Sequence, residues 1–238
     1  HAVFEILSNA IDEAREGRGS LITVTRYADQ SIEVEDFGRG CPVDWNEKEG
    51  RYNWELVFCE LYAGGKYNNN DGDNYEYSLG LNGLGSCATQ YASEYFDAVI
   101  HRDGFEYTLH FEKGENVGGL KKEPYSGRKT GSKFRWKPDL DVFTDISIPV
   151  EYYLDVLKRQ AVVNAGVTFR FRNEAGGKFE TTDFKYENGI EDYVKELAGE
   201  NSLTQSVFWQ TERRGRDRED KPEYKVKLSV SFCFSNTV

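Results

Sequence analysis

The segment from residue 3 to residue 16 has the polar and apolar periodicity of a helix. With about 100° of rotation per residue, its polar side chains gather within about 80° of Glu5. That face carries Ser8, Asn9, Asp12, Glu13 and Glu16, and the opposite arc carries Val3, Phe4, Ile6, Leu7, Ala10, Ile11 and Ala14. The segment is therefore predicted to be an amphipathic helix with one face on a core, ending at Gly17 and Gly19.

The composition fits a folded, acidic protein. The chain has 238 residues, a formal net charge of −11, 38% hydrophobic and 14% aromatic residues, which favours a sizeable core over disorder. No apolar run approaches the roughly 18 residues of a membrane span, and no segment resembles a secretory signal. A soluble, cytoplasmic protein without a membrane partner is expected. The negative charge argues against this chain as the surface that grips a nucleic-acid backbone.

The cysteines and the missing methionine give two further expectations. Cys41, Cys59, Cys87 and Cys233 form no CxxC pair, and the chain has three histidines. A zinc site and a disulfide framework are therefore not expected, and we predict four reduced thiols. Because the sequence contains no Met, we expect it to be a piece of a longer protein.

The remaining patterns alternate between strand and helix without an internal repeat. Strands are expected at 21–29 and 31–38 as a hairpin, and at 96–102, 106–113, 132–139 and 226–234, with a hairpin near 173–177. Helices are expected at 53–62, 86–96, 150–165 and 190–197, and a loop at 63–74. Strands that follow one another through turns favour an α+β sandwich over a parallel doubly wound sheet.

The predicted first helix carries a pair of side chains suited to chemistry. Glu5 and Asn9 are i, i+4 neighbours on its polar face, about 5 to 6 Å apart at Cβ. A carboxylate can accept a proton from water, and an amide oxygen can bind Mg²⁺. A solvated polar face explains the same residues equally simply.

Two glycine-containing segments are further candidates. EDFGRGCP at 35–42 places Asp36 at the mouth of a turn, where it could accept a hydrogen bond from an exocyclic amine such as that of adenine. An ordinary turn would look the same. GLNGLG at 80–85 precedes a helix, where free N–H groups favour phosphate. It matches neither a Walker A motif nor a Rossmann fingerprint.

The order and spacing of these motifs resemble the split ATP-binding site of the GHKL family, which includes gyrase, the ninety-kilodalton heat-shock chaperones, MutL and sensor histidine kinases. FEILSNAIDEA resembles the family's first box, VEDFGRGCP its second and GLNGLG its third. Within the family, the sequence is most similar to the ATPase region of bacterial type IIA DNA topoisomerases, the gyrase B and topoisomerase IV ParE subunits. The distinguishing segments are IDEA after the Asn, GRGCPV at 38–43, AGGKY at 63–67, KTGSKFRWKPD at 129–139 and FT at 143–144.

The resemblance implies a fold and a role for individual residues. The fold would be a two-layer α+β sandwich, the Bergerat fold, with a mixed, mostly antiparallel sheet and helices on one face. Glu5 would be the general base for the water that attacks the γ-phosphate, and Asn9 the magnesium ligand. Asp36 would receive the adenine amine, Gly40 would let the base lie flat, and Ser132 would complete the adenine pocket through water.

Other positions would line the nucleotide site or its lid, according to the same resemblance. Lys66 would lie at the hinge of the lid, and Arg39, Pro42 and Arg102 at the rim of the pocket. The full set of further cofactor-binding positions is Asp12, Glu13, Arg39, Cys41, Pro42, Lys66, Gly80, Leu81, Asn82, Gly83, Leu84, Gly85 and Arg102.

The sequence departs from the family's usual pattern at four positions. Glu76 stands where a lysine is usual, Leu79 where a glycine is usual, and Asn82 where a histidine is usual. Phe37 replaces the usual second acidic residue after Asp36. These departures predict a divergent branch of the family.

The resemblance also implies a larger assembly. Residues 1–202 would be the ATP-binding domain without its N-terminal arm, and residues 203–238 the beginning of a transducer domain. The parent would be an ATP-operated dimer clamp that passes DNA strands together with a DNA-cleaving, gyrase A or ParC-like partner. The chain alone is expected to bind ATP and Mg²⁺, hydrolyse ATP slowly and stay monomeric. A MutL-type or chaperone-type ATPase, or a non-catalytic nucleotide-binding module, remain alternatives from sequence.

Overall fold

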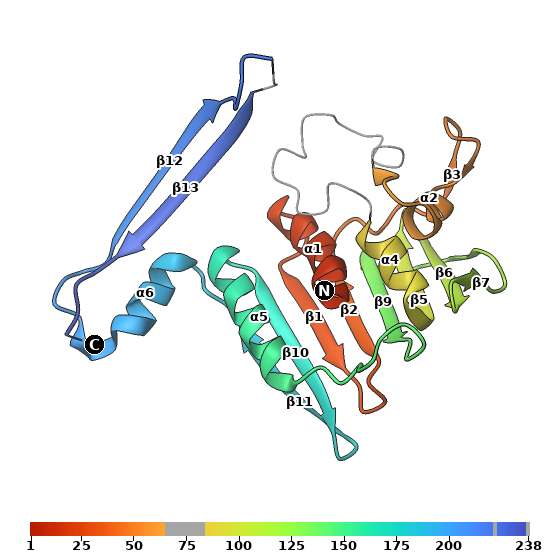
Figure 1. Ribbon diagram of the computed structural model, residues 1–238, viewed down its shortest axis with the longest axis horizontal. Coiled ribbons are helices and arrows are strands. Elements are labelled where there is room, and N and C mark those ends of the chain that lie inside the picture. The colour runs from red at the N-terminus through yellow and green to blue at the C-terminus, as the bar shows by residue number, and fades with distance from the viewer. Residues whose placement is uncertain (65–83, 221–222, 237–238) are drawn as a thin grey trace.

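The computed structural model describes residues 1–64, 84–220 and 223–236 and is built around one large sheet (Figure 1). The strands of this sheet are β1 (Leu21–Arg26), β2 (Ile32–Asp36), β5 (Ser93–Arg102), β6 (Phe105–Glu112), β7 (Glu115–Asn116), β8 (Lys121–Pro124), β9 (Gly131–Pro138), β10 (Thr168–Ala175) and β11 (Lys178–Phe184). Their order is β11-β10-β1-β2-β9-β5-β6-β7, with β8 also paired to β6. β1 and β10 run parallel, and the other neighbours run antiparallel. The predicted mixed, mostly antiparallel sheet is confirmed.

Helices cover one face of this sheet and bury its apolar residues (Figure 1). They are α1 (Ala2–Arg15), α2 (Asn53–Cys59), α4 (Gly85–Tyr91) and α5 (Val150–Val163). α1 follows the predicted pattern, because Ile6, Leu7 and Ile11 are almost fully buried in the core. Phe58 of α2 packs between the layers, with its ring centroid 5.5 to 5.8 Å from those of Phe96, Phe111 and Phe134. The helices and the sheet therefore share one hydrophobic core.

The opposite face of the sheet is polar because charged residues alternate with the buried ones along each strand. Glu33 lies opposite Arg135 in the neighbouring strand, and Arg135 lies opposite Asp97. Asp97 in turn lies opposite His110 and hydrogen bonds to its Nδ1 at 2.5 Å. Opposite charges in register stabilise such a sheet face modestly.

The last elements form a separate hairpin. After α6 (Ile190–Ala198) and η1 (Gly199–Asn201), β12 (Val207–Gly215) and β13 (Tyr224–Phe232) pair only with each other and extend away from the large sheet (Figure 1). A third small sheet joins β3 (Trp45–Asn46) and β4 (Arg51–Tyr52). The domain boundary after residue 202 stays a prediction. Among the described residues, no helix is both long and apolar enough to cross a membrane.

Two helix predictions were wrong at their C-terminal ends. The helix expected at 86–96 ends at Tyr91, and β5 begins at Ser93. Ser93 Oγ donates to Thr89 O at 2.5 Å, and Phe96 is buried in the sheet, so tertiary packing overrides the helical pattern. The helix expected at 53–62 ends at Cys59, and Glu60 is already extended. The short strands β3, β4, β7 and β8 and the longer β12 were not predicted.

Candidate functional site

The predicted pair Glu5 and Asn9 lies on α1, facing the first turn of α4. Asn9 is half-buried, and its Nδ2 donates to Ser86 Oγ at 3.3 Å. Because the amide nitrogen is bound in this way, the amide oxygen is the atom that can face a cation. Gly85 is pressed against Glu5: a side chain there would place its Cβ 2.7 Å from Glu5 Oε2. Glu5 itself is exposed, so its carboxylate can reach water.

The donor set at this position fits Mg²⁺ as a sparsely coordinated ion. No group of three or more His, Cys, Asp or Glu side chains that could hold a metal is present in the described part of the chain. Mg²⁺ commonly keeps several waters and binds through one or two protein oxygens plus substrate phosphates. A single amide oxygen from Asn9 is therefore a suitable protein ligand when phosphates supply the others.

Two residues of the predicted polar face of α1 need comment. The placement of Ser8 on that face was wrong: Ser8 is 3% exposed, and its hydroxyl donates to Glu5 O at 2.8 Å. This back-bond satisfies the hydroxyl inside the core. Asp12 is half-buried one turn from Asn9, at the place the helical spacing predicts.

Asp36 ends β2 and faces the start of β9. Its Oδ1 accepts a hydrogen bond from Gly38 N at 2.8 Å. Removal of the carboxyl group from solvent raises the pKa of Asp36 to about 7, although N–H groups of Gly38 and Ser132 oppose this shift. Ser132 is buried, and its Oγ accepts from Cys41 N at 2.8 Å, which leaves the hydroxyl proton free to donate elsewhere. A carboxylate acceptor and a hydroxyl donor thus lie side by side.

The turn after β2 packs closely against β5. Gly40 has a φ of +86°, and a Cβ at this position would lie 2.7 Å from the carbonyl oxygen of His101. Arg102 Nη1 donates to Gly40 O at 2.8 Å, so the residue predicted at the rim holds the turn by its backbone. Burial raises the pKa of the Cys41 thiol to about 12, and Cys41 Sγ lies 3.7 Å from Pro42 O. Cys41 and Pro42 therefore contribute backbone and shape to this wall.

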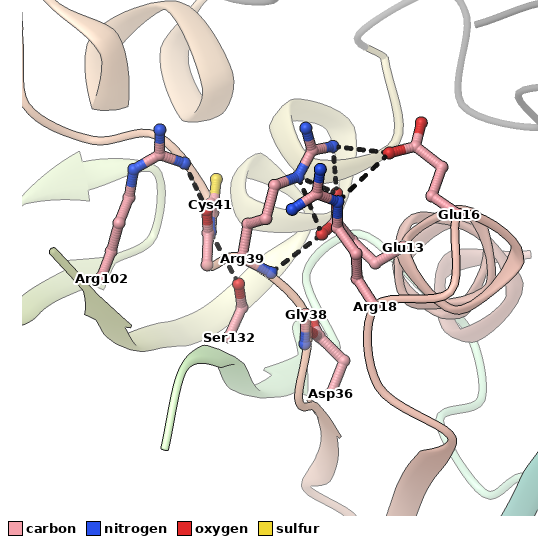
Figure 2. Close-up of polar contacts among 10 residues, drawn as sticks. Glu13, Glu16, Arg18, Asp36, Gly38, Arg39, Cys41, Arg102 and Ser132 are labelled. Carbon is pink, nitrogen blue, oxygen red and sulfur yellow. Dashed lines mark hydrogen bonds and ion pairs between the residues drawn. The ribbon is translucent and has the colours of Figure 1, made fainter. Parts of the chain in front are cut away.

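Arg39 turns back toward α1 (Figure 2). Its backbone N donates to Glu13 Oε2 at 2.9 Å, and its Nη2 lies 2.7 Å from Glu13 Oε1 and 3.1 Å from Glu16 Oε2. Glu13, predicted as a cofactor-binding residue, thus binds the turn. Glu16 was not predicted as a site residue. Its place three residues after Glu13 on the polar face of the helix was the signal that could have found it.

The structure thus brings most of the predicted residues into two groups joined by α1. Glu5, Asn9, Leu84 and Gly85 meet where α1 contacts α4, and Leu84 is the N-cap residue of that helix. Asp36, Arg39, Gly40, Cys41, Pro42, Arg102 and Ser132 surround the turn. The predictions for Lys66, Glu76, Leu79, Gly80, Leu81, Asn82 and Gly83 lie outside the described residues.

Comparisons with known proteins agree with the resemblance seen in the motifs. No family model matches the sequence. The B-type subunit of DNA gyrase from Thermotoga maritima is 33% identical over 236 residues, covering 99% of this chain and 36% of the relative. The B-type subunit of DNA topoisomerase 4 from Salmonella typhimurium is 36% identical over 197 residues, 82% of this chain and 30% of the relative.

A solved structure gives the same result for the fold. The crystal structure of the 43K ATPase domain of Thermus thermophilus gyrase B in complex with an aminocoumarin matches with a TM-score of 0.76 and 27% identity. The match covers 99% of this chain and 57% of that one. The chain spans about a third of the length of the curated relatives that it matches. It belongs to the family of gyrase B and topoisomerase IV ParE subunits and corresponds to the GHKL ATPase domain of these proteins.

Proposed function

We propose that this chain binds ATP with Mg²⁺ and hydrolyses the γ-phosphate bond. The observation that carries the proposal is the meeting of Glu5 and Asn9 with the first turn of α4, on the same helix that anchors the Asp36 turn. One helix would then position both the chemistry at the phosphates and the recognition of the base.

Each residue has a physical role in this proposal. The exposed carboxylate of Glu5 accepts a proton from the attacking water. The amide oxygen of Asn9, oriented by Ser86, holds the cation, which would neutralise phosphate charge. Asp36 accepts a hydrogen bond from the adenine amine, and the Ser132 hydroxyl donates toward the base through water.

Replacement of Glu5 by glutamine tests the catalytic part. Glu5→Gln keeps a polar side chain of equal size but removes the base, so MgATP binding should persist while hydrolysis falls about 100-fold or more. Glu151→Gln is the matched control, because Glu151 is also the acidic residue in the first turn of a 14-residue helix. It should leave both properties unchanged. Hydrolysis by Glu5→Gln at the wild-type rate would refute the role of Glu5.

Nucleotide preference tests the recognition part. GTP carries a carbonyl oxygen where ATP carries the amine, so it would place an acceptor opposite the acceptor Asp36. Affinity for GTP is expected to be at least about tenfold lower, measured by calorimetry in the presence of Mg²⁺. Equal affinities for the two nucleotides would contradict the assignment of Asp36.

The wider role is inferred from the family. We infer that the parent protein is a DNA topoisomerase whose ATP-dependent homodimer clamp drives strand passage, with a DNA-cleaving partner subunit of the gyrase A or ParC type. Residues 203–238 would begin its transducer domain, and the protein would act in the cytoplasm. By itself, the chain should hydrolyse ATP slowly and sediment as a monomer. Sedimentation of this chain as a dimer at micromolar concentration, with or without MgATP, would contradict that part.

A further inference from the structure

We propose that Glu13 and Glu16 are positioning residues for adenine, which act through Arg39 and hold the 38–40 turn against α1 without touching the nucleotide. The inference rests on the proposed function, because it concerns the site that would bind the base. It differs from the role implied by the family resemblance, in which Glu13 belongs to the nucleotide-binding set and Glu16 has no role.

The contacts form a short chain of alternating charge (Figure 2). Arg39 lies between Glu13 and Glu16, at 2.7 and 3.1 Å from Nη2, and Arg18 Nε lies 3.8 Å from Glu16 Oε2. The side chains of Glu13, Glu16 and Arg39 are only 22 to 35% exposed, so water screens them less than a fully exposed pair. A planar guanidinium can meet two carboxylates at once, which a lysine ammonium does less well.

The same contacts fix the backbone of the turn. Glu13 Oε2 accepts from Arg39 N, and Gly38 packs so closely on Glu13 that a Cβ there would lie 2.6 Å from Oε2. On the other side, a Cβ on Gly19 would lie 2.8 Å from Phe37 O. The turn is therefore pressed against α1 and the segment after it. Any shift of the Arg39 guanidinium is transmitted to the residues that flank Asp36.

Glu13 also acts on Asp36 by its charge, whereas Glu16 does not feature among the groups that do so. The groups facing Asp36 are Glu13 from α1, Glu35 from its own strand, and the N–H groups of Gly38 and Ser132. Burial disfavours the charge on Glu13, but the hydrogen bonds from Arg39 outweigh it and lower the pKa of Glu13. Glu13 thus stays ionised near neutral pH and makes ionisation of Asp36 harder.

The test compares ATP with purine riboside triphosphate, which lacks the 6-amino group. The ratio of the two affinities isolates the contact to Asp36, and titration of the phosphates cancels in it. Glu16→Gln removes one half-exposed ion pair, so the ratio should fall about two- to fivefold. Arg39→Lys should give a similar fall, because the ammonium cannot bridge both carboxylates. Asp155→Asn, which breaks the surface pair with Arg159 on α5, is the matched control and should leave the ratio unchanged.

A pH series separates the two carboxylates. In the wild-type protein, the preference for ATP over the analogue should rise with pH as Asp36 ionises. Glu13→Gln should lower the preference about tenfold or more at neutral pH through loss of a charge-assisted bond to the backbone, and should move the midpoint of the rise to lower pH. Glu16→Gln should leave that midpoint in place.

The outcomes distinguish this inference from the proposed function. If the wild-type protein binds neither ATP nor the analogue, the proposed function fails. If it binds ATP but Glu16→Gln and Arg39→Lys keep the wild-type ratio, the positioning role is refuted. Equal weakening of both nucleotides would also refute it, because a general loss of structure does not distinguish the amine. Thermal unfolding of each variant checks that the fold is retained.

Discussion

Replacement of Gly40 by alanine tests how closely the 38–40 turn approaches β5. Two costs can be worked out from the structure. A φ of +86° costs an L-residue about 1–2 kcal/mol, and a Cβ only 2.7 Å from the carbonyl oxygen of His101 forces a backbone shift worth about 1–3 kcal/mol. Gly40→Ala should therefore lower the free energy of unfolding by about 2–5 kcal/mol.

Gly104→Ala is the matched control for this experiment. Gly104 has a φ of +79°, but a Cβ there would meet nothing within 4 Å, so only the conformational cost of about 1–2 kcal/mol applies. Equilibrium urea denaturation of the two variants gives the difference, which should be about 1–3 kcal/mol. Equal destabilisation of both variants would show that the turn is not in close contact with His101, and the reasoning would fail.

Three further predictions concern stability and reactivity. The pKa of Asp36 is raised to about 7 in the folded protein from an ordinary 3.8, so the folded state binds the extra proton between these values. Stability from this group is complete below about pH 4 and is lost as pH rises through 7; the advantage of Asp36→Asn over wild type should grow with pH to at most about 4 kcal/mol, and a pH-independent difference in urea denaturation would contradict this. Phe58→Ala should lower the free energy of unfolding by about 3–5 kcal/mol, whereas Phe143→Ala, at a 38% exposed position, should cost less than about 1 kcal/mol; equal costs would refute the aromatic core. Burial raises the pKa of Cys41 to about 12, so iodoacetamide should modify it far more slowly in the native than in the urea-unfolded protein at pH 8, as peptide mass spectrometry can measure; similar rates would contradict the burial.

Local periodicity was enough to predict the elements whose own side chains determine their structure. α1 lies where the spacing of Ile6, Leu7 and Ile11 places it, because a single apolar face suffices to define a helix. Ser8 was wrong because its hydroxyl is satisfied inside the core by Glu5 O, which a helical wheel does not represent. The residues after Tyr91 were wrong for a similar reason: pairing with β9 draws them into β5.

The candidate site was predictable in its residues but not in its contacts. The spacing of Glu5 and Asn9 on one helix face is a local property, and the sequence was sufficient to find it. The contact between Arg39 and Glu16 joins a turn to a helix that is distant in sequence, and no local pattern specifies it. The same holds for Ser132, whose hydroxyl reaches Cys41 N only because β9 lies beside β2. Long-range pairings of this kind depend on the whole topology.

The parallel pairing of β1 with β10 has a consequence for the order of folding events. β1 lies in the interior of the large sheet, yet Arg26 and Asn173, which face each other across this pair, are 147 residues apart. Until β10 is in place, β1 has an open edge that can pair with another chain. Closing so long a loop is entropically costly before any contact compensates for it, so folding should be slow. During synthesis, the helix that carries Glu5 and Asn9 would rest on an incomplete sheet until Ala175 has left the ribosome, and chaperones would have that interval in which to bind.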